Sequence, residues 1–279
     1  MAEKRYSIPQ GRLHIHGWRG DLMDAAAQLG TELIRTGARP RHEVDFEGAR
    51  VFLKGAPLAS GPATRHGLRR LVLRAHAPRI SEYNNLWWLH NRLFETPVAL
   101  AAGVLVRAGR PRYQFLLTVV EAAQPFEDVF PQETPSAQRA VMVELGREVA
   151  RFHALHFVHR DLYPRNLLLR PAGSMRRVVF LDTWAGGPTP GRRGPAYDLA
   201  CLFLEGARDF QAEHQAAFLE SYFDERRRQA QPAAPQQLLR RAQSARNRLW
   251  RQLDREPGRR RGRDLPPATW DPPKVTPAS

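Results

Sequence analysis

The fold class is decided by residues 159–166, which read His-Arg-Asp-Leu-Tyr-Pro-Arg-Asn, and by the later triplet Phe180-Leu181-Asp182. Asp161 and Asn166 stand close together in the first stretch, and Asp182 ends the second. Each stretch adjoins an apolar, strand-like run, so both would end at one edge of a small sheet. A proton-accepting carboxylate beside two hard oxygen ligands is the set of groups that phosphoryl transfer needs.

The spacing of these residues matches the H-R-D-L-x-x-x-N catalytic loop of protein kinases. In this assignment Asp161 is the catalytic base that accepts the proton of the acceptor hydroxyl. Asn166 and Asp182 hold Mg²⁺ against the phosphates of ATP. A chance His-Arg-Asp triplet in an arginine-rich chain is the weaker interpretation, because the asparagine, the flanking strands and the downstream aspartate all fall in place. The sequence therefore predicts a kinase with ATP and Mg²⁺ as cofactors.

A kinase also needs a lysine on a strand to contact the phosphates and a glutamate on a helix to orient that lysine. Residues 51–54, Val-Phe-Leu-Lys, form an apolar strand pattern that ends in Lys54, in a chain whose other lysines are at positions 4 and 274. Glu82, at the start of a predicted helix over residues 80–94, is the candidate partner. The alternative for Glu82 is a carboxylate that only stabilises a helix N-terminus.

These patterns predict an α+β, bilobal, protein-kinase-like fold with a small β-rich N-lobe that holds one key helix and a larger, mostly helical C-lobe. The backbone at Glu121 and Ala123, between the lobes, is expected to receive the adenine of ATP. The predicted domains follow one another along the chain: an irregular lead over 1–20, the N-lobe over 21–121, the C-lobe over 122–230, and a basic Pro- and Arg-rich helix and tail over 231–279.

Hydrophobic periodicity predicts the individual elements. A turn at Glu47-Gly48 predicts a hairpin between two short apolar strands. The loop over 188–194 is expected to be mobile, and the last ~20 residues are expected to be disordered. The predicted helices cover 21–35, 80–94, 135–157, 197–205, 211–229 and 236–253, and further strands cover 97–106, 113–121, 167–169 and 178–181.

The net charge of +15 in 279 residues favours anionic partners such as an anionic membrane, an acidic glycolipid or nucleic acid. Between Glu225 and Asp264 the chain has thirteen arginines and four acidic residues; the alternative is a solvated tail. The first 20 residues have no signal-peptide pattern, and no run of about 20 apolar residues would span a membrane. These observations predict a cytoplasmic protein. Cys201 sits in an apolar run and is expected to be a core residue.

The chain resembles the Kdo/WaaP (InaA-like) lipopolysaccharide kinase family of the protein-kinase-like superfamily. The resemblance covers about residues 40 to 225 and rests on the pieces already quoted and on three more: Ser81-Glu82-Tyr83, residues 97–103, and Tyr197-Asp198-Leu199-Ala200. It implies ATP- and Mg²⁺-dependent phosphorylation of a sugar hydroxyl, of Kdo or heptose, in the lipopolysaccharide inner core. It also implies work at the cytoplasmic face of the inner membrane, where peripheral contact with anionic lipid would fit the basic surface.

Several departures from protein kinases bear on the acceptor. No G-x-G-x-x-G precedes Lys54, so a less regular loop around Gly37 is expected to cover the phosphates. Asp182 is followed by Thr183-Trp184 in place of Phe-Gly, and an A-P-E element is missing. The usual platform for peptide substrates is therefore absent, which favours a small-molecule or glycan acceptor. Asp198 is expected to brace the catalytic loop through hydrogen bonds to the backbone or to His159.

Other functions stay open at this point. One is a kinase of the same fold with another acceptor, such as a cationic small molecule or a protein. Another is a pseudokinase scaffold, and a third is a nucleic-acid-binding protein that uses the arginine-rich tail, although its few aromatic residues argue against specific nucleic-acid binding. His153 and His156 are expected to be packed helix residues rather than metal ligands. Trp87 and Trp88 are expected to pack in the core or between lobes rather than stack on a sugar.

Overall fold

The computed structural model describes residues 2–58, 76–173, 175–188, 194–205, 210–230 and 234–254. Most of the predicted mobile loop, residues 189–193, and the predicted disordered tail lie outside the described residues. The chain forms two compact units. Unit 1 runs to Ala122 and also includes Thr183–Ala185, and unit 2 comprises Ala123–Asp182 and the chain from Gly186 onward. In the described parts, no helix is both long and apolar enough to cross a membrane.

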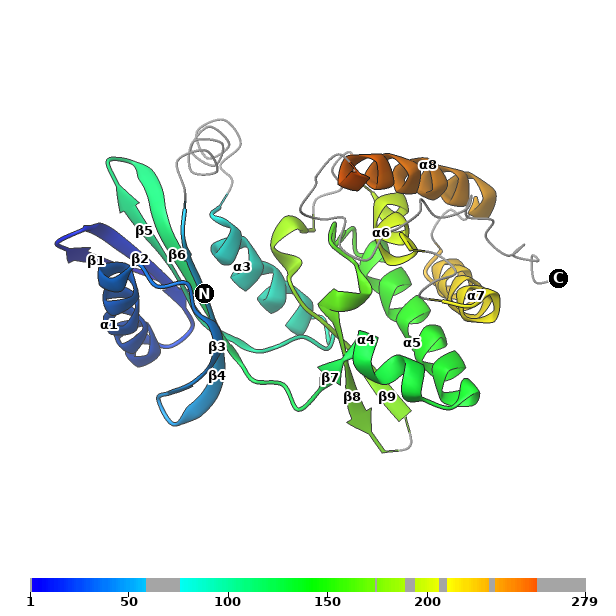
Figure 1. The fold of residues 1–279 in the computed structure, drawn as a ribbon, viewed down its shortest axis with the longest axis horizontal. Helices are drawn as coiled ribbons and strands as arrows, with labels where there is room; N and C mark the ends of the chain where they lie inside the picture. The colour runs from blue at the N-terminus through cyan, green and yellow to red at the C-terminus, as the bar shows by residue number, and fades with distance from the viewer. Residues whose placement is uncertain are drawn as a thin grey trace. The chain divides into compact units, whose positions relative to one another are not determined.

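Unit 1 is built on a six-stranded antiparallel sheet with the strand order β1-β2-β5-β6-β4-β3 (Figure 1). The predicted hairpin at Glu47-Gly48 is confirmed, and both turn residues have positive φ, 49° and 76°, as a tight two-residue turn requires. The six strands are β1 (Ala2–Ile8), β2 (Gly11–Gly17), β3 (Arg41–Phe46), β4 (Ala49–Pro57), β5 (Ala99–Arg107) and β6 (Arg110–Val119).

The expectation of an irregular lead over residues 1–20 is wrong, because β1 and β2 form a hairpin that extends the sheet. β2 alternates strictly, with Leu13 and Ile15 fully buried between polar neighbours. That alternation identifies β2 as a strand, although the alternating segment is short. β1 is a charged edge strand, as edge strands commonly are, and charged edges resemble irregular segments in a sequence.

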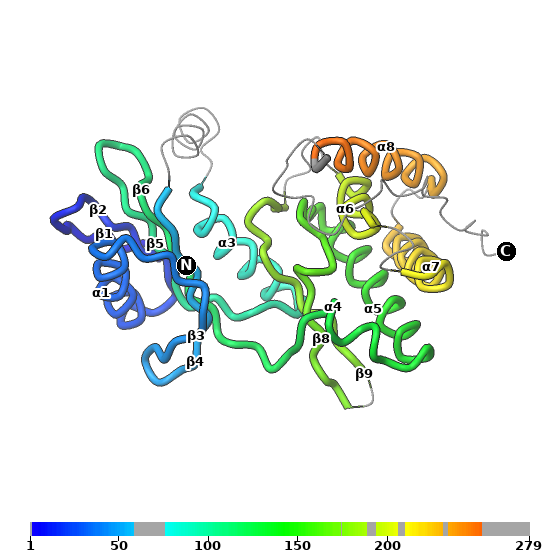
Figure 2. The backbone as a smooth tube through the Cα atoms, viewed as in Figure 1, coloured from blue at the N-terminus to red at the C-terminus, as the bar shows by residue number. Residues whose placement is uncertain are grey.

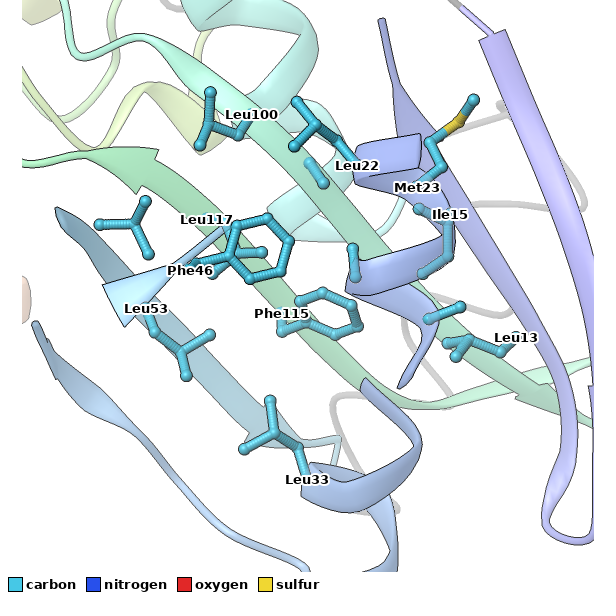
Figure 3. Close-up of a cluster of buried hydrophobic side chains, with 14 of the residues drawn as sticks. Leu13, Ile15, Leu22, Met23, Leu33, Phe46, Leu53, Leu100, Phe115 and Leu117 are labelled. Atoms are coloured by element: carbon cyan, nitrogen blue, oxygen red, sulfur yellow. The ribbon is translucent and has the colours of Figure 1, made fainter. Parts of the chain in front are cut away.

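A helix covers each face of this sheet. α1 (Gly20–Thr36) packs on the face that carries Leu13 and Phe115, and Figure 3 shows its side chains Leu22, Met23 and Leu33 in this core. α3 (Pro78–His90) packs on the opposite face, against Ala102, Val104 and Leu116. Because successive strand residues point to opposite faces, each central strand serves both cores.

Unit 2 is mostly helical. Its most extensive helix packing is between α5 (Pro135–Ala154) and α7 (Ala212–Arg228) (Figure 2). A Cβ on Gly146 would lie 2.4 Å from the Phe218 carbonyl oxygen, so this helix contact requires glycine. The helix prediction that began at Pro135 is confirmed, with Thr134 as the N-cap. The remaining helices are α4 (Phe126–Val129), α6 (Pro195–Leu202), α8 (Pro235–Asp254) and the short η1 (Phe130–Gln132) and η2 (Pro164–Asn166).

A small antiparallel sheet of unit 2 presents the motif residues. It has the order β7-β8-β9, with β7 at Gln124–Pro125, β8 at Leu167–Ala172 and β9 at Met175–Phe180. β8 begins directly after Asn166, and β9 ends two residues before Asp182. Leu167 pairs with Phe180, so the sheet brings the two motif stretches to one edge, as predicted.

Candidate active site

In unit 1, Lys54 lies on the face of the sheet that α3 covers. Val51 and Leu53 of the same strand are buried in the core between α1 and the sheet. Because side chains alternate along β4, Lys54 points to the opposite face of the sheet. There the Lys54 Nζ donates a hydrogen bond of 3.0 Å to Oε1 of Glu82. The predicted pairing of this lysine with this glutamate is therefore present.

Arg79 also belongs to this cluster, although the sequence did not predict it. Its guanidinium contacts the second carboxylate oxygen of Glu82, and its backbone N–H donates to Oε1 of Gln114 over 3.1 Å. Glu82 is only 1% exposed, and a buried carboxylate needs such partners to keep its charge. The signal was the i,i+3 spacing of Arg79 and Glu82 on one helix. Two cationic side chains therefore flank the Glu82 carboxylate.

In unit 2, His159 organises the start of the catalytic loop. Its Nε2 lies 2.9 Å from the Leu181 carbonyl oxygen, and its Nδ1 lies 3.3 Å from the backbone N–H of Asp161. A carbonyl only accepts and an N–H only donates, so the ring is neutral, with the proton on Nε2. His159 thereby ties the loop before Asp161 to the strand end before Asp182.

Asp198 braces this loop, as predicted. Its Oδ2 accepts from the His159 backbone N–H over 2.7 Å, and its Oδ1 accepts from the Arg160 N–H over 2.6 Å. Arg160 has a φ of 63°, a left-handed conformation that costs a non-glycine residue about 1 kcal/mol, and the hydrogen bond to Asp198 holds it there. His153 adds a third contact, 3.0 Å from Nε2 to Oδ2.

His153 is packed as expected, and His156 is not. Both ring nitrogens of His153 are used, because Nδ1 faces the Tyr222 hydroxyl at 2.9 Å while Nε2 faces Asp198. Burial lowers the pKa of His153, so the ring is neutral, with Nε2 donating to the carboxylate. His156 is exposed, just beyond the end of α5, with a φ of 60°.

Replacing Asp198 with asparagine should destabilise unit 2 by about 2–4 kcal/mol. The amide keeps one accepting oxygen and turns an NH₂ toward a backbone N–H, so at least one buried donor loses its partner. Urea unfolding of the wild type and Asp198→Asn measures this difference. Asp224→Asn, at an exposed position of α7, is the matched control and should change the free energy of unfolding by less than about 0.5 kcal/mol.

Asp161 and Asn166 are in direct contact. The Asn166 Nδ2 donates to the Asp161 backbone oxygen over 2.7 Å and to its Oδ2 over 3.0 Å. Burial raises the pKa of Asp161, and Arg165, whose Nη2 lies 3.5 Å from Oδ1, opposes that rise. Arg165 also stacks on the Tyr163 ring at 4.0 Å, which holds its guanidinium in place. A partly buried carboxylate with a raised pKa is suited to accept a proton.

The donor set in unit 2 fits Mg²⁺. Both acceptors of Asn166 are oxygens that cannot donate, so its NH₂ group must face Asp161 and its Oδ1 is the atom left for a cation. Asp182 supplies a carboxylate, and amide and carboxylate oxygens are the hard ligands that Mg²⁺ prefers. Among the described residues, no three His, Cys, Asp or Glu side chains gather as a metal site. Phosphate oxygens and waters would therefore have to complete the coordination of an ion held by Asn166 and Asp182.

The backbone around Asp182 is held on both sides. The Leu181 N–H donates to the Asn166 carbonyl oxygen over 2.9 Å, and Asp182 itself has a φ of 50°. Four residues later, a Cβ on Gly186 would lie 2.5 Å from the Val158 carbonyl oxygen, and Gly187 exchanges two 3.1 Å hydrogen bonds with Val158. These two glycines were not predicted from the sequence. Their adjacency just after Asp182 was the available signal.

The other predicted site residues lie at or near the ends of strands and helices. Glu121 lies beyond the end of β6, and Ala123 lies directly before β7. Gly37 is the left-handed C-cap of α1, with a φ of 64°, so helix termination already accounts for this glycine. The adenine contact and the phosphate-covering role stay predictions.

The predicted packing of Trp87 and the predicted burial of Cys201 are confirmed. The Trp87 indole N–H donates to the Ala99 carbonyl oxygen over 2.9 Å. The Trp87 ring packs against the core between α3 and the sheet. Trp88 is half-buried, and the Arg92 guanidinium lies 3.9 Å from its ring centre. Cys201 is a free, fully buried thiol, and burial raises its pKa, which makes it unreactive.

Comparison with known proteins places these features in a family. The model of the lipopolysaccharide kinase (Kdo/WaaP) family matches residues 60–222. A search of curated proteins gave no match. A solved structure described as WaaP in complex with acyl carrier protein is similar over 84% of this chain and 98% of that chain, with 18% identity and a TM-score of 0.56. A double mutant of the Mycobacterium tuberculosis PknI kinase domain is similar over 64% of this chain and 66% of that chain, with 13% identity and a TM-score of 0.37.

The likeness to the WaaP structure concerns the fold, and it confirms the predicted α+β, protein-kinase-like class. The family match spans more than half of the chain and includes Glu82, the catalytic loop, Asp182 and Asp198. Lys54 lies just before the matched range. The chain therefore belongs to the lipopolysaccharide kinase (Kdo/WaaP) family, a family of phosphotransferases.

Proposed function

We propose that this kinase transfers the γ-phosphoryl group of ATP, in the presence of Mg²⁺, to a hydroxyl of Kdo or heptose in the lipopolysaccharide inner core. The observation that carries the proposal is the pair of hydrogen bonds from Asn166 to Asp161, at 2.7 and 3.0 Å. They aim the base carboxylate and at the same time orient the amide oxygen toward a cation. Both parts are needed for phosphoryl transfer.

Each residue has one role in the proposed reaction. Asp161 accepts the proton of the sugar hydroxyl as the hydroxyl oxygen bonds to the γ-phosphorus and the bond to ADP breaks. Lys54, held by Glu82, contacts the α- and β-phosphates, and the backbone near Glu121 and Ala123 receives adenine. Asn166 and Asp182 would hold Mg²⁺, which neutralises charge on the phosphate oxygens when bound.

The family description and the charge of the chain support the proposed acceptor and location. The family description names lipopolysaccharide, a lipid with a sugar core, and the chain carries a net charge of +15 that suits an anionic glycolipid. We place the enzyme at the cytoplasmic face of the inner membrane, in peripheral contact with anionic lipid. A specific nucleic acid is not part of this proposal.

Transfer of labelled phosphate from ATP to lipopolysaccharide with an unphosphorylated inner core tests the function. Lys54→Met should lower transfer by at least about 100-fold, because the phosphates lose their point charge while the fold keeps a side chain of similar length. Lys4→Met is the matched control, since Lys4 pairs with Asp24 in an exposed ion pair and should leave transfer unchanged.

Mass spectrometry of the hydrolysed core then distinguishes Kdo from heptose as the acceptor. Label on a protein or on a small cationic molecule, with none on the core, would assign this chain a different acceptor. If the wild type binds ATP but transfers phosphate to no acceptor, the protein is a pseudokinase.

A further inference from the structure

The last described helix, α8, has two chemically different faces. Its buried face carries Leu239, Ala242, Ala245, Arg246 and Leu249. Its exposed arginines are Arg240, Arg241, Arg248 and Arg251, and we call these four the α8 arginine face. At about 100° of rotation per residue, all four fall within an arc of about 100°, turned away from the buried side. Residues 240 to 251 span about 16 Å along the helix axis.

The α8 arginine face differs from the arginines of the other helices. Those commonly pair with an acidic residue three positions away, as in Arg35–Glu32 of α1, Arg151–Glu148 of α5 and Arg227–Asp224 of α7. On α8, only Arg251 has an acidic residue, Asp254, within four positions along the sequence. Within the described residues, no ion pair joins the α8 arginine face to a carboxylate. Like charges so placed repel one another and weaken a helix, and a bound anionic surface would relieve that repulsion.

The fifth arginine of α8 fixes the helix to unit 2. Arg246 is 2% exposed, and its Nε donates to the carbonyl oxygens of Phe203 and Leu204 over 2.8 and 3.0 Å. These carbonyls lie just past the end of α6, so the guanidinium satisfies backbone acceptors that the helix leaves unpaired. α8 is thereby anchored by a buried polar contact as well as by its apolar residues. Its exposed arginines are held in a fixed array.

We propose that the α8 arginine face docks on the anionic headgroups of a lipid bilayer. This inference rests on the proposed function, because an acceptor that is part of a lipid lies in a membrane. The other exposed side chains of the arc, Gln237 and Ser244, are uncharged and polar. An arc without apolar or aromatic side chains suits binding to the headgroups by charge, without insertion into the acyl layer. Single-stranded nucleic acids, by contrast, are usually held by stacking on aromatic side chains.

Sedimentation with lipid vesicles tests the docking surface directly. The full chain should bind phosphatidylcholine vesicles that contain phosphatidylglycerol and should bind pure phosphatidylcholine weakly. Because the attraction is electrostatic, added salt should weaken it. The variant R240Q/R241Q/R248Q/R251Q should bind the anionic vesicles on the order of 600-fold more weakly, since each of the four basic residues near an anionic leaflet strengthens binding about fivefold.

The matched control removes the same charge elsewhere. R12Q/R107Q/R110Q/R112Q takes four exposed arginines from β2, β5 and β6 of unit 1. It should keep anionic vesicle binding within about threefold of the wild type. Equal losses in both variants would mean that binding reports net charge alone, and the proposal would be wrong. Tight binding of a random DNA duplex in place of vesicles would also overturn it. Glutamine is a good helix former, and thermal unfolding should show that both variants are folded.

A second measurement separates this proposal from the proposed function. Phosphate transfer to a water-soluble core oligosaccharide should be unchanged in R240Q/R241Q/R248Q/R251Q, because none of the four arginines has a role in the proposed reaction. If the wild type fails to transfer phosphate but its vesicle binding needs the α8 arginine face, the proposed function fails and the docking surface stands. If transfer succeeds and vesicle binding ignores the α8 arginine face, the docking surface alone fails.

Discussion

Replacing Asp161 with asparagine is expected to lower turnover by about 10³-fold at saturating ATP and acceptor. The substituted amide can still accept the hydrogen bond that Asn166 donates to Oδ2, so the loop should keep its geometry. It cannot take up a proton, and the acceptor hydroxyl must then lose its proton without a base. Steady-state phosphate transfer by the wild type and Asp161→Asn measures the effect. Asp45→Asn, an exposed aspartate of β3, should retain full activity.

The pH dependence of the same reaction tests Asp161 independently. A base works when it is deprotonated, so kcat/KM should fall as the pH drops through the pKa of Asp161, which burial raises above the ordinary aspartate range. Arg165 opposes that rise, so Arg165→Gln should move the acid limb of the profile to higher pH. A limb that stays in place, or moves down, would show that another group is the base.

Replacing Asp182 with asparagine is expected to raise the Mg²⁺ concentration for half-maximal activity by about 10- to 100-fold and to lower the maximal turnover by about 10²- to 10³-fold. The amide keeps an oxygen but loses the negative charge that attracts the ion. A Mg²⁺ titration of phosphate transfer, started from protein treated with a chelator, measures both quantities. The chelated wild type should be inactive and should recover fully when Mg²⁺ is restored.

Asp45→Asn again serves as the charge-matched control for Asp182→Asn, and its Mg²⁺ titration should coincide with that of the wild type. An unchanged titration in Asp182→Asn would remove this residue from the metal site. Retained activity in the chelated wild type would remove Mg²⁺ from the reaction.

Local sequence patterns were sufficient to predict the strands and helices that hold the motif residues. The Glu47-Gly48 hairpin, the helix that begins at Pro135 and the strands on either side of the motif were all predictable, because turn chemistry, capping and periodicity act over a few residues. The β1–β2 hairpin was not recognised. β1 is charged, and β2 pairs with β5, a strand about 90 residues further along the chain.

The sequence by itself determined the identity and spacing of the motif residues. The spacing of the motif can be read directly from the chain, at His159, Asp161, Asn166 and Asp182. The positive charge of α8 follows from its arginine content. Only the tertiary structure decided how these groups are held. It showed that Arg79 shares Glu82 with Lys54, that Asp198 supports a left-handed Arg160, and that Asn166 turns its NH₂ to Asp161. Such contacts depend on the direction of side chains across packed elements, which sequence distance does not specify.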